Sequence, residues 1–364
     1  MSDISQQLID QVREALDKKQ ALHVQGNNTK AFMGRQSKPA SAKVISVAEH
    51  SGILKYEPVE LVMTARAGTT LAEIDAALEE NQQMLASDPA RFSGQATIGG
   101  SLAANQSGPA RPWIGSLRDH VLGVSLINGK AEHLRFGGQV MKNVAGYDVS
   151  RLQAGAMGTL GVMTELSFKV LPKPAASMTQ TLSISADDAI ELMNQLAGTP
   201  KPINGAAWVN ETLYVRLSGS LTSVESSASE WQQKWNFNAL PEGEADSFWK
   251  TLRDQELDYF SGDDMLWRFS IKSTSKVSQL DVPSASWAID WCGAQRWLKG
   301  KYSHTDLQEW ALENGGEVVL YRGAKNEVDV YCQPTPAFLR LQKNIKQALD
   351  PENIFNLGRL YPQT

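Results

Sequence analysis

Three glycine-rich segments in the first half of the sequence have the composition of loops that bind phosphate groups. They are residues 26–29, residues 97–105 and residues 155–161, and the last is preceded by the related segment 142–148. Glycine lets the main chain approach a ligand closely, so that several backbone N–H groups can donate to one diphosphate. The spacings of the P-loop and of the Rossmann dinucleotide motif are both missing. A simple turn would explain one such segment, but three of them predict a site for a phosphorylated cofactor.

The second of these segments is predicted to begin a short helix of small residues. Gly99 and Gly100 stand at its start, and Ala103 and Ala104 follow one turn later. A flat cofactor can lie close to such a helix, and the first backbone N–H groups of a helix favour negative charge. The alternative is a helix that needs small residues only to pack closely against a neighbouring element.

Basic side chains in the second half are weaker candidates for binding an anion. In the predicted strand 266–272, the two-residue period places Arg268 and Lys272 on one face. This face would bind an anion beside a cofactor, or it is the solvated side of an amphipathic strand, which is the more common case. Arg296 admits the same two interpretations.

The elements that must position the loops are predicted to be α/β in the first half of the chain. Apolar residues recur at helical spacing within residues 1–19, which predicts an amphipathic helix. A second helix is predicted over residues 70–84, where Thr70 and Glu73 form a capping-box pair. Strands are predicted at residues 21–25, 42–47, 60–65, 121–127 and 160–171.

Pro172 and Pro174 mark a predicted domain boundary, because proline interrupts regular structure. Beyond it, predicted strands alternate with helices, an order that suggests an antiparallel sheet with helices on one face. These strands are predicted at residues 180–184, 206–209, 213–218, 266–272, 287–291, 317–322 and 328–331. The helices are predicted at residues 186–196, 224–235, 247–256, 305–314 and 336–349. A chain of 364 residues is long enough for two such units.

Composition and charge argue against several other classes of protein. The formal net charge is −5 and basic residues alternate with acidic ones, which is not typical of a protein that binds nucleic acid or an anionic membrane. Cys292 and Cys332 are too few for an iron–sulfur cluster, and the five histidines lack ligand spacing, so no metal site is predicted. No stretch has the roughly 20 apolar residues of a membrane span. The first helix lacks the apolar core of a signal peptide, so a cytoplasmic location is expected.

Taken together and in this order, the glycine-rich segments resemble the FAD-binding domain of the vanillyl-alcohol-oxidase superfamily, which is of the PCMH type. The combination of Thr-x-Gly-Gly-x-x-Ala-x-Asn with Gly-Tyr-Asp and Gly-x-x-Gly-Thr-Leu-Gly-Val carries the resemblance. It covers residues 24–174, returns at residues 350–360 and is looser over residues 266–297. The chain as a whole resembles the smaller flavin subunits of bacterial glycolate oxidases.

The fold implied by this resemblance is α+β. It consists of a PCMH-type two-part FAD-binding domain over residues 1–171 and an antiparallel-sheet cap domain over residues 172–335. A C-terminal segment, residues 336–364, would return to the FAD-binding domain, and its part 356–359 resembles a segment that packs back onto that domain.

The resemblance also implies which residues bind FAD. The first loop and its edges would hold the diphosphate: Gln25, Gly26, Asn27, Asn28, Thr29 and Lys30. The second segment would line the flavin and the rest of the diphosphate: Thr97, Gly99, Gly100, Ala103, Asn105 and Gly108. The third would flank the adenosine end or the ribityl chain: Gly158, Thr159, Gly161 and Val162. Asp88 and Pro89 would form the edge of the same cleft.

Some positions depart from the family pattern. The first loop usually contains more glycine, so Asn27 and Asn28 are expected to adopt demanding backbone conformations, for which Asn is the next best residue. The terminal segment usually has proline where Leu357 stands. Relatives with covalent flavin attach it through a histidine of the first loop, and residues 26–34 contain none. Non-covalent FAD is therefore implied.

The activity implied by the resemblance is hydride transfer from the α-carbon of a small 2-hydroxy acid, glycolate, to FAD, followed by electron transfer to a separate iron–sulfur subunit. The His-x-Gly-Asp-Gly and Glu-His-Gly motifs of relatives that oxidise such acids are missing from the sequence, and no catalytic residue is assigned. The hypothesis is therefore that a larger homologous flavin subunit oxidises the substrate. This chain would be an auxiliary flavin carrier or scaffold, with any membrane association made through partners. Two alternatives remain open: a non-catalytic assembly subunit that keeps the fold, and an independent flavin oxidoreductase acting on another substrate.

Overall fold

The computed structural model describes residues 2–36, 41–138, 148–323 and 329–362, so residues 142–147 of the third glycine-rich region lie outside the described residues. The chain forms two compact units. Unit 1 consists of Met1–Gln106, Ser116–Lys173 and Gln333–Thr364, and unit 2 of Ser107–Gly115 and Pro174–Cys332. The expected division fell after residues 171 and 335, and it did not separate the short segment Ser107–Gly115 from the residues around it.

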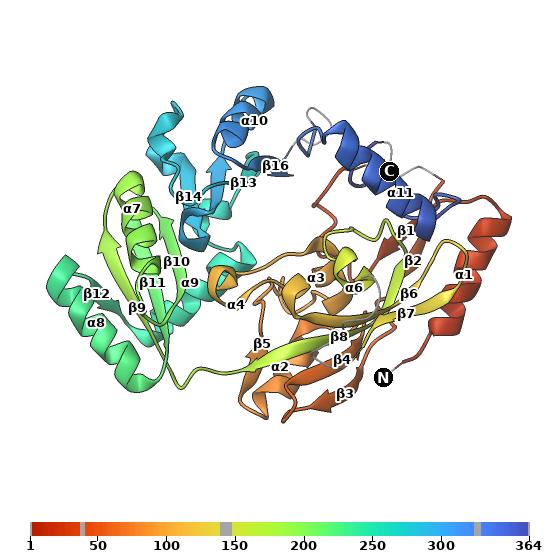
Figure 1. Ribbon diagram of the computed structural model, residues 1–364, viewed down its shortest axis with the longest axis horizontal. Coiled ribbons are helices and arrows are strands. Elements are labelled where there is room, and N and C mark those ends of the chain that lie inside the picture. The colour runs from red at the N-terminus through yellow and green to blue at the C-terminus, as the bar shows by residue number, and fades with distance from the viewer. Residues whose placement is uncertain (1, 37–40, 139–147, 324–328, 363–364) are drawn as a thin grey trace. The chain divides into compact units, whose positions relative to one another are not determined.

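An antiparallel sheet and a separate parallel strand pair form the framework of unit 1. The sheet has the order β3-β4-β8-β6-β7, with β5 also paired to β8, and all of its pairs are antiparallel. In Figure 1 the long strand β8 runs through this sheet with β4 and β6 beside it. Its strands are β3 Ile53–Glu57, β4 Val62–Arg66, β5 Gln83–Leu85, β6 Val121–Ile127, β7 His133–Gly137 and β8 Val162–Pro172. The separate parallel pair consists of β1 Leu22–Gln25 and β2 Lys43–Ser46.

Four helices of unit 1, at residues 5–17, 71–79, 98–104 and 117–120, pack apolar residues into one core that also contains the strands. Leu8 and Val12 of α1 are fully buried, as the helical spacing of apolar residues predicts. The helices are α1 Ser5–Asp17, α2 Leu71–Glu79, α3 Ile98–Ala104, α5 Leu117–His120, α6 Val149–Leu152 and α11 Pro336–Leu349.

Helix α2 is shorter than predicted. Thr70 caps it as expected, accepting from the Glu73 N–H at 3.2 Å. The predicted helix continued to residue 84, but it ends at Glu79, and Gln82 adopts a positive φ of 52°. The following residues then pair with β8 as β5. Tertiary pairing with a long strand overrides the helical propensity of these residues.

Unit 2 is an eight-stranded sheet with the order β12-β9-β11-β10-β14-β15-β13-β16, in which every pair is antiparallel. The antiparallel sheet predicted from the sequence is therefore confirmed. Its strands are β9 Ala176–Ser183, β10 Ile203–Val209, β11 Thr212–Gly219, β12 Asn238–Leu240, β13 Leu266–Ser270, β14 Trp287–Asp290, β15 Gln295–Lys299 and β16 Glu317–Arg322. Its helices are α4 Arg111–Ile114, α7 Ala186–Ala197, α8 Leu221–Trp235, α9 Glu242–Asp254 and α10 His304–Glu313, with 3₁₀ turns η1 Asp258–Phe260, η2 Val277–Gln279, η3 Ser284–Ser286 and η4 Trp291–Gly293.

In unit 2, strands β12 and β15 were not predicted, and one predicted strand is not formed in the described part of the chain. The predicted strand 328–331 is not formed by its described residues, since Tyr331 makes only an isolated bridge with Val319. Strand β15 was not predicted, because four of its five residues are buried and the alternation typical of a half-buried strand is missing. It lies between β14 and β13.

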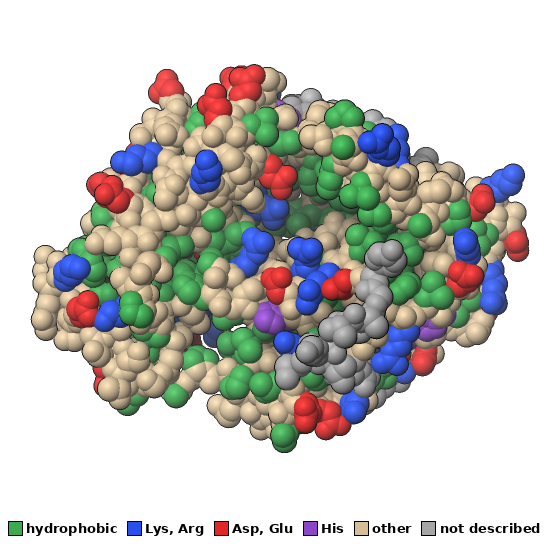
Figure 2. Space-filling model, in the orientation of Figure 1, with side chains coloured by type: hydrophobic (Ala, Val, Ile, Leu, Met, Phe, Trp, Pro, Cys, Tyr) green, Lys and Arg blue, Asp and Glu red, His purple; other side chains and the backbone are tan. Residues whose placement is uncertain are grey.

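No helix in the described parts of the chain combines the length and apolarity that a membrane crossing requires. On the face shown in Figure 2, basic and acidic side chains are interspersed, in agreement with the mixed charge pattern of the sequence.

Candidate cofactor site

A cavity lies in unit 1, where the glycine-rich segments meet. The predicted residues that line the cavity are Gln25, Gly26, Asn27, Asn28, Thr29, Lys30, Thr97, Gly99, Gly100, Ala103, Gly158 and Gly161. Segments that are far apart in the sequence thus contribute to one concave surface.

The first loop, residues 26–30, presents its backbone N–H groups without protein partners. Within the described part of the chain, none of these five N–H groups donates to a backbone or side-chain acceptor. The carbonyl of Asn28 accepts from the Ala31 N–H at 3.1 Å, which closes the turn. A run of open N–H groups on a cavity wall is a typical binding site for an anion such as a phosphate.

The residue types of this loop follow from its close contacts. A Cβ added at Gly26 would lie 2.7 Å from Oγ1 of Thr97, so a larger residue does not fit there. Asn28 has a φ of 60°, a conformation that Asn tolerates better than most residues. The same was expected of Asn27, but its φ is not positive. Asn27 instead uses its side chain, whose Nδ2 donates to the Gln95 carbonyl at 2.9 Å.

Helix α3 lines the cavity through Gly99, Gly100, Ala103 and Ala104. Its N-terminal N–H groups were expected to face negative charge, but they are used within the protein. Ile98 N–H donates to Thr69 O at 2.9 Å, Gly99 N–H to Ala67 O at 2.9 Å and Gly100 N–H to Thr97 Oγ1 at 3.2 Å. These bonds correct the expectation, and they favour the alternative in which small residues allow close packing, since a Cβ at Gly99 would lie 2.7 Å from that of Ala67.

The third segment packs against both α3 and the end of the chain. Gly155 N–H donates to Leu102 O at 3.1 Å, and Met157 N–H donates to Ala103 O at 2.9 Å. Gly158 has a φ of 71°, and a Cβ there would lie 2.7 Å from Nδ2 of Asn356. The segment is thereby fixed at the cavity edge by contacts to two separate parts of unit 1.

Two residues near the C-terminus complete the cavity wall. Asn356 accepts from the Val24 N–H at 2.8 Å and donates to Met157 O at 2.7 Å. Arg359 donates to Ala31 O at 3.0 Å, and both residues line the cavity. The sequence indicated that this terminal segment packs onto the FAD domain, but it did not identify the two side chains as part of the site.

The remaining lining residues were not predicted to bind the cofactor. They are His23, Val24, Ala31, Val47, Ala67, Ala104, Met157 and Met163. Several belong to different strands or strand ends, and they meet only because the strands converge in the fold.

Six of the residues predicted to bind FAD do not line the cavity. Asp88 lies 3.6 Å from Arg91 in an ion pair, and the carbonyl of Pro89 accepts from the same arginine. Asn105 is the C-cap of α3 with a φ of 47°. Gly108 belongs to unit 2, where its carbonyl accepts from the Trp291 indole at 2.9 Å.

The other two are Thr159 and Val162. Thr159 is buried and its hydroxyl donates to Ala156 O at 2.7 Å, while Val162 is fully buried in the core of unit 1. Local glycine patterns predicted the loops correctly but did not determine which neighbouring side chains face the cavity.

Lys30 is the basic residue of the first loop. Its Nζ lies 3.4 Å from Ser101 Oγ and 5.2 Å from the centre of the Phe92 ring, and it forms no ion pair with any described residue. Burial, and secondarily the charge of Arg91, lowers the pKa of Lys30 to about 8. A bound anion would favour the charged form of this lysine.

The three anion-binding candidates of unit 2 lie in different surroundings. Arg296 is paired with Phe269 across the sheet and shares its face, so it lies on the opposite face from Arg268, whose guanidinium is 5.8 Å from the Tyr321 ring. Lys272 is exposed. These positions do not form one anion site.

Arg296 instead supports a strained turn in the interior. It is fully buried, and its Nε donates to Gly293 O at 2.9 Å. Trp291 and Cys292, immediately before this glycine, have φ values of 51° and 58°, which are unfavourable for large side chains. Burial lowers the pKa of Arg296 to about 10.

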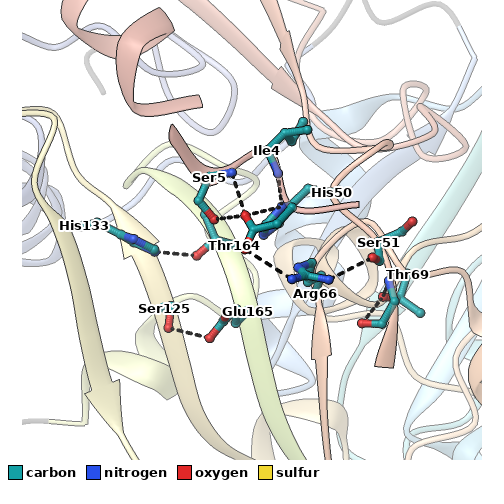
Figure 3. Close-up of polar contacts among 12 residues, drawn as sticks. Ile4, Ser5, His50, Ser51, Arg66, Thr69, Ser125, His133, Thr164 and Glu165 are labelled. Atoms are coloured by element: carbon teal, nitrogen blue, oxygen red, sulfur yellow. Dashed lines mark hydrogen bonds and ion pairs between the residues drawn. The ribbon is translucent and has the colours of Figure 1, made fainter. Parts of the chain in front are cut away.

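Histidines were not expected to act as ligands or catalysts. His50 is fully buried, and its Nδ1 accepts from the Ile4 N–H at 3.2 Å (Figure 3). His133 lies 2.9 Å from the Thr164 hydroxyl, as Figure 3 also shows. His23 lines the cavity, which the sequence did not predict. Among the described residues no group of three or more His, Cys, Asp or Glu side chains is arranged to hold a metal ion.

Comparisons with known proteins agree with this geometry. Residues 4–137 match the family described as FAD binding domain. Glycolate oxidase subunit GlcE of Escherichia coli is 41% identical over 363 residues, which cover 99% of this chain and 98% of that protein. Glycolate oxidase subunit GlcD of Bacillus subtilis is 32% identical over 142 residues, or 39% of this chain and 30% of that protein. The solved structure of 4-ethylphenol oxidase from Gulosibacter chungangensis has the same fold, with a TM-score of 0.72 at 14% identity, over 99% of this chain and 88% of the oxidase.

Proposed function

The chain belongs to the FAD-binding family that includes the glycolate oxidase subunit GlcE of Escherichia coli, and on this basis we propose that it is the FAD-binding subunit of a glycolate oxidase. Its part in the reaction is to bind and orient FAD. In such a complex, FAD supplies the acceptor for a hydride from the α-carbon of the 2-hydroxy acid.

The observation that carries this proposal is the open first loop. Five consecutive backbone N–H groups, those of residues 26–30, have no acceptor among the described residues and belong to residues that line the cavity. A run of open backbone donors on a cavity wall favours a ligand with several acceptor oxygens. The diphosphate of FAD has this chemistry.

The residues proposed to hold FAD are those predicted positions that also line the cavity. The first loop, Gln25 to Lys30, would bind the diphosphate, and the small residues Gly100 and Ala103 of α3 would lie against the planar part of the cofactor. Gly158 and Gly161 would allow the main chain to approach it closely.

Non-covalent attachment is also proposed. It is supported by the lack of histidine in residues 26–34. Because His23 lines the cavity, the proposal requires a direct test. Acid precipitation of the purified protein should release all flavin into the supernatant, and a pellet that stays yellow would contradict non-covalent binding.

In the complex, we assign this chain an auxiliary role beside a larger homologous flavin subunit that oxidises the substrate and an iron–sulfur subunit that receives the electrons. The dispersed positions of Arg268, Lys272 and Arg296 support this role, since they do not form a carboxylate site.

The test is an absorbance spectrum of the purified chain, followed by anaerobic addition of glycolate with and without the partner subunits. Flavin bands that bleach only with partners are expected. Bleaching of the isolated chain would indicate an independent oxidoreductase instead. A colourless protein that does not take up added FAD would contradict the flavoprotein proposal and favour a non-catalytic assembly subunit.

A further inference from the structure

The final residues of the chain contact the first and third loops of the cavity at the same time. We propose that Asn356 and Arg359 are positioning residues for the cofactor, which hold the first loop in the conformation that exposes its N–H groups. The C-terminal segment would then complete a site whose other parts lie in the first 163 residues. This inference rests on the proposed binding of FAD.

Asn356 joins the two loops through one side chain. Its Oδ1 accepts from the Val24 N–H at 2.8 Å, and its Nδ2 donates to Val24 O at 3.3 Å and to Met157 O at 2.7 Å. Its own N–H donates to Leu22 O at 3.0 Å. The amide thus fixes the strand that leads directly into Gly26 and holds it beside the 157–158 turn.

Arg359 holds the other end of the first loop. Its guanidinium donates to Ala31 O at 3.0 Å, to Arg35 O at 3.3 Å and to Lys30 O at 3.5 Å. The Arg35 N–H donates in return to the carbonyl of Arg359 at 3.0 Å. These bonds fix the backbone at the C-terminal end of the first loop.

The attachment of the segment does not depend on these two side chains alone. Lys346, on α11, donates to Thr159 O at 2.6 Å and to Phe355 O at 2.8 Å. Leu22 N–H donates to Ile354 O at 2.7 Å. Substitution of Asn356 or Arg359 therefore leaves the segment docked and affects mainly the loop.

The expected consequence is a change in affinity for the cofactor. A loop that is held in its binding conformation before the ligand arrives loses little conformational entropy on binding, whereas a loosened loop loses more. We expect Asn356→Asp and Arg359→Gln to weaken FAD binding by roughly 10- to 100-fold, the range that corresponds to losing one or two positioning hydrogen bonds. The aspartate keeps an acceptor for Val24 N–H but loses the donor to Met157 O, and Arg359→Lys should restore part of the affinity.

The experiment measures FAD affinity by quenching of flavin fluorescence on titration of the full-length apoprotein, together with the visible circular dichroism of bound FAD and the melting temperature of the apoprotein. Two control variants separate the causes. Arg340→Gln changes an exposed arginine on α11, and Leu8→Ala removes a fully buried side chain of α1 that does not line the cavity. Both controls should bind FAD as the unmodified protein does, although Leu8→Ala should melt at a lower temperature.

The outcomes are distinguishable. If the unmodified protein does not bind FAD, the proposed function fails, and the inference with it. If it binds FAD and both Asn356→Asp and Arg359→Gln bind equally well, only the positioning role is refuted. The positioning role is also refuted if Leu8→Ala weakens FAD binding as much as Asn356→Asp and Arg359→Gln do. The loss of affinity would then follow the stability of the protein instead of the geometry of the loop.

Discussion

Lys346 and Asp350 form an ion pair in the interior of unit 1, with Nζ 2.8 Å from Oδ2. The side chains of Lys346 and Asp350 are almost completely buried, at 7% and 0% exposure. Each also forms hydrogen bonds to backbone groups. The carboxylate of Asp350 also accepts the N–H groups of Ile354 at 3.1 Å and Phe355 at 2.9 Å. The pair thereby fixes the turn that carries the C-terminal segment back to the cavity.

Replacing Lys346 by methionine should strongly destabilise unit 1. The change leaves a buried carboxylate without its cation, and breaking one partner of such a pair typically costs about 3–5 kcal/mol. Urea unfolding followed by circular dichroism measures the loss. Lys343→Met, at an exposed position of the same helix, is the matched control and should change stability by less than about 0.5 kcal/mol. Equal unfolding midpoints for the two variants would show that the ion pair is not important for stability.

Replacing Gly26 by alanine should weaken FAD binding, because the added methyl group would lie 2.7 Å from Oγ1 of Thr97. The backbone of Gly26 does not have a positive φ, so this contact is the reason for the effect. We expect a loss of about tenfold or more in a fluorescence titration, equivalent to about 1.4 kcal/mol. In contrast, Gly243→Ala in α9 meets no atom within 4 Å and should bind FAD normally. Unchanged affinity of the Gly26 variant would argue against the loop as the diphosphate site.

Affinity for FAD should fall as the pH rises above about 8. Burial lowers the pKa of Lys30 to about 8 in the free protein, so above this pH the lysine must regain a proton when a diphosphate binds. The limiting slope is roughly tenfold per pH unit. Titrations on both sides of the pKa of about 8 should show this slope for FAD and ADP. Riboflavin, which has no phosphate, should not show it. Lys30→Met should remove the slope, and a slope that persists would assign it to another group.

Acid should destabilise unit 1 through His50. Burial is the main cause that lowers the pKa of His50; the charges of Arg66 and His133 lower it further, whereas those of Asp3 and Glu165 raise it. The unfolded chain then binds a proton near pH 6.5 that the folded chain does not, so stability is complete above this pH and is lost as the pH falls below it.

The substitution that tests this is His50→Asn, whose Oδ1 can still accept from the Ile4 N–H. Its stability should depend less on pH between about 7 and 5, by up to about 1.4 kcal/mol per pH unit. His304, whose pKa is also lowered by burial, titrates in both proteins and so serves as a common background. If the urea midpoints of the unmodified protein and of His50→Asn change equally over this pH range, His50 is excluded as the cause.

The sequence by itself determined the local parts of this protein. Gly26 and Gly158 marked loops that do line one cavity, because the need for a residue without a Cβ is encoded at the position itself. Thr70 likewise marked a helix start, since capping involves residues only a few positions apart. The resemblance to a flavin-binding family was carried by these same local patterns.

Only the tertiary structure decided which distant residues complete the site and which neighbours turn away from it. Asn356 reaches Val24 across 332 positions, and Val162, next to Gly161, faces the core. Helix α2 ends at Glu79 because a distant strand pairs with the residues that follow. The physical reason is that hydrogen bonds and packing between distant segments depend on how the whole chain docks, and neither periodicity nor spacing along the sequence records that arrangement.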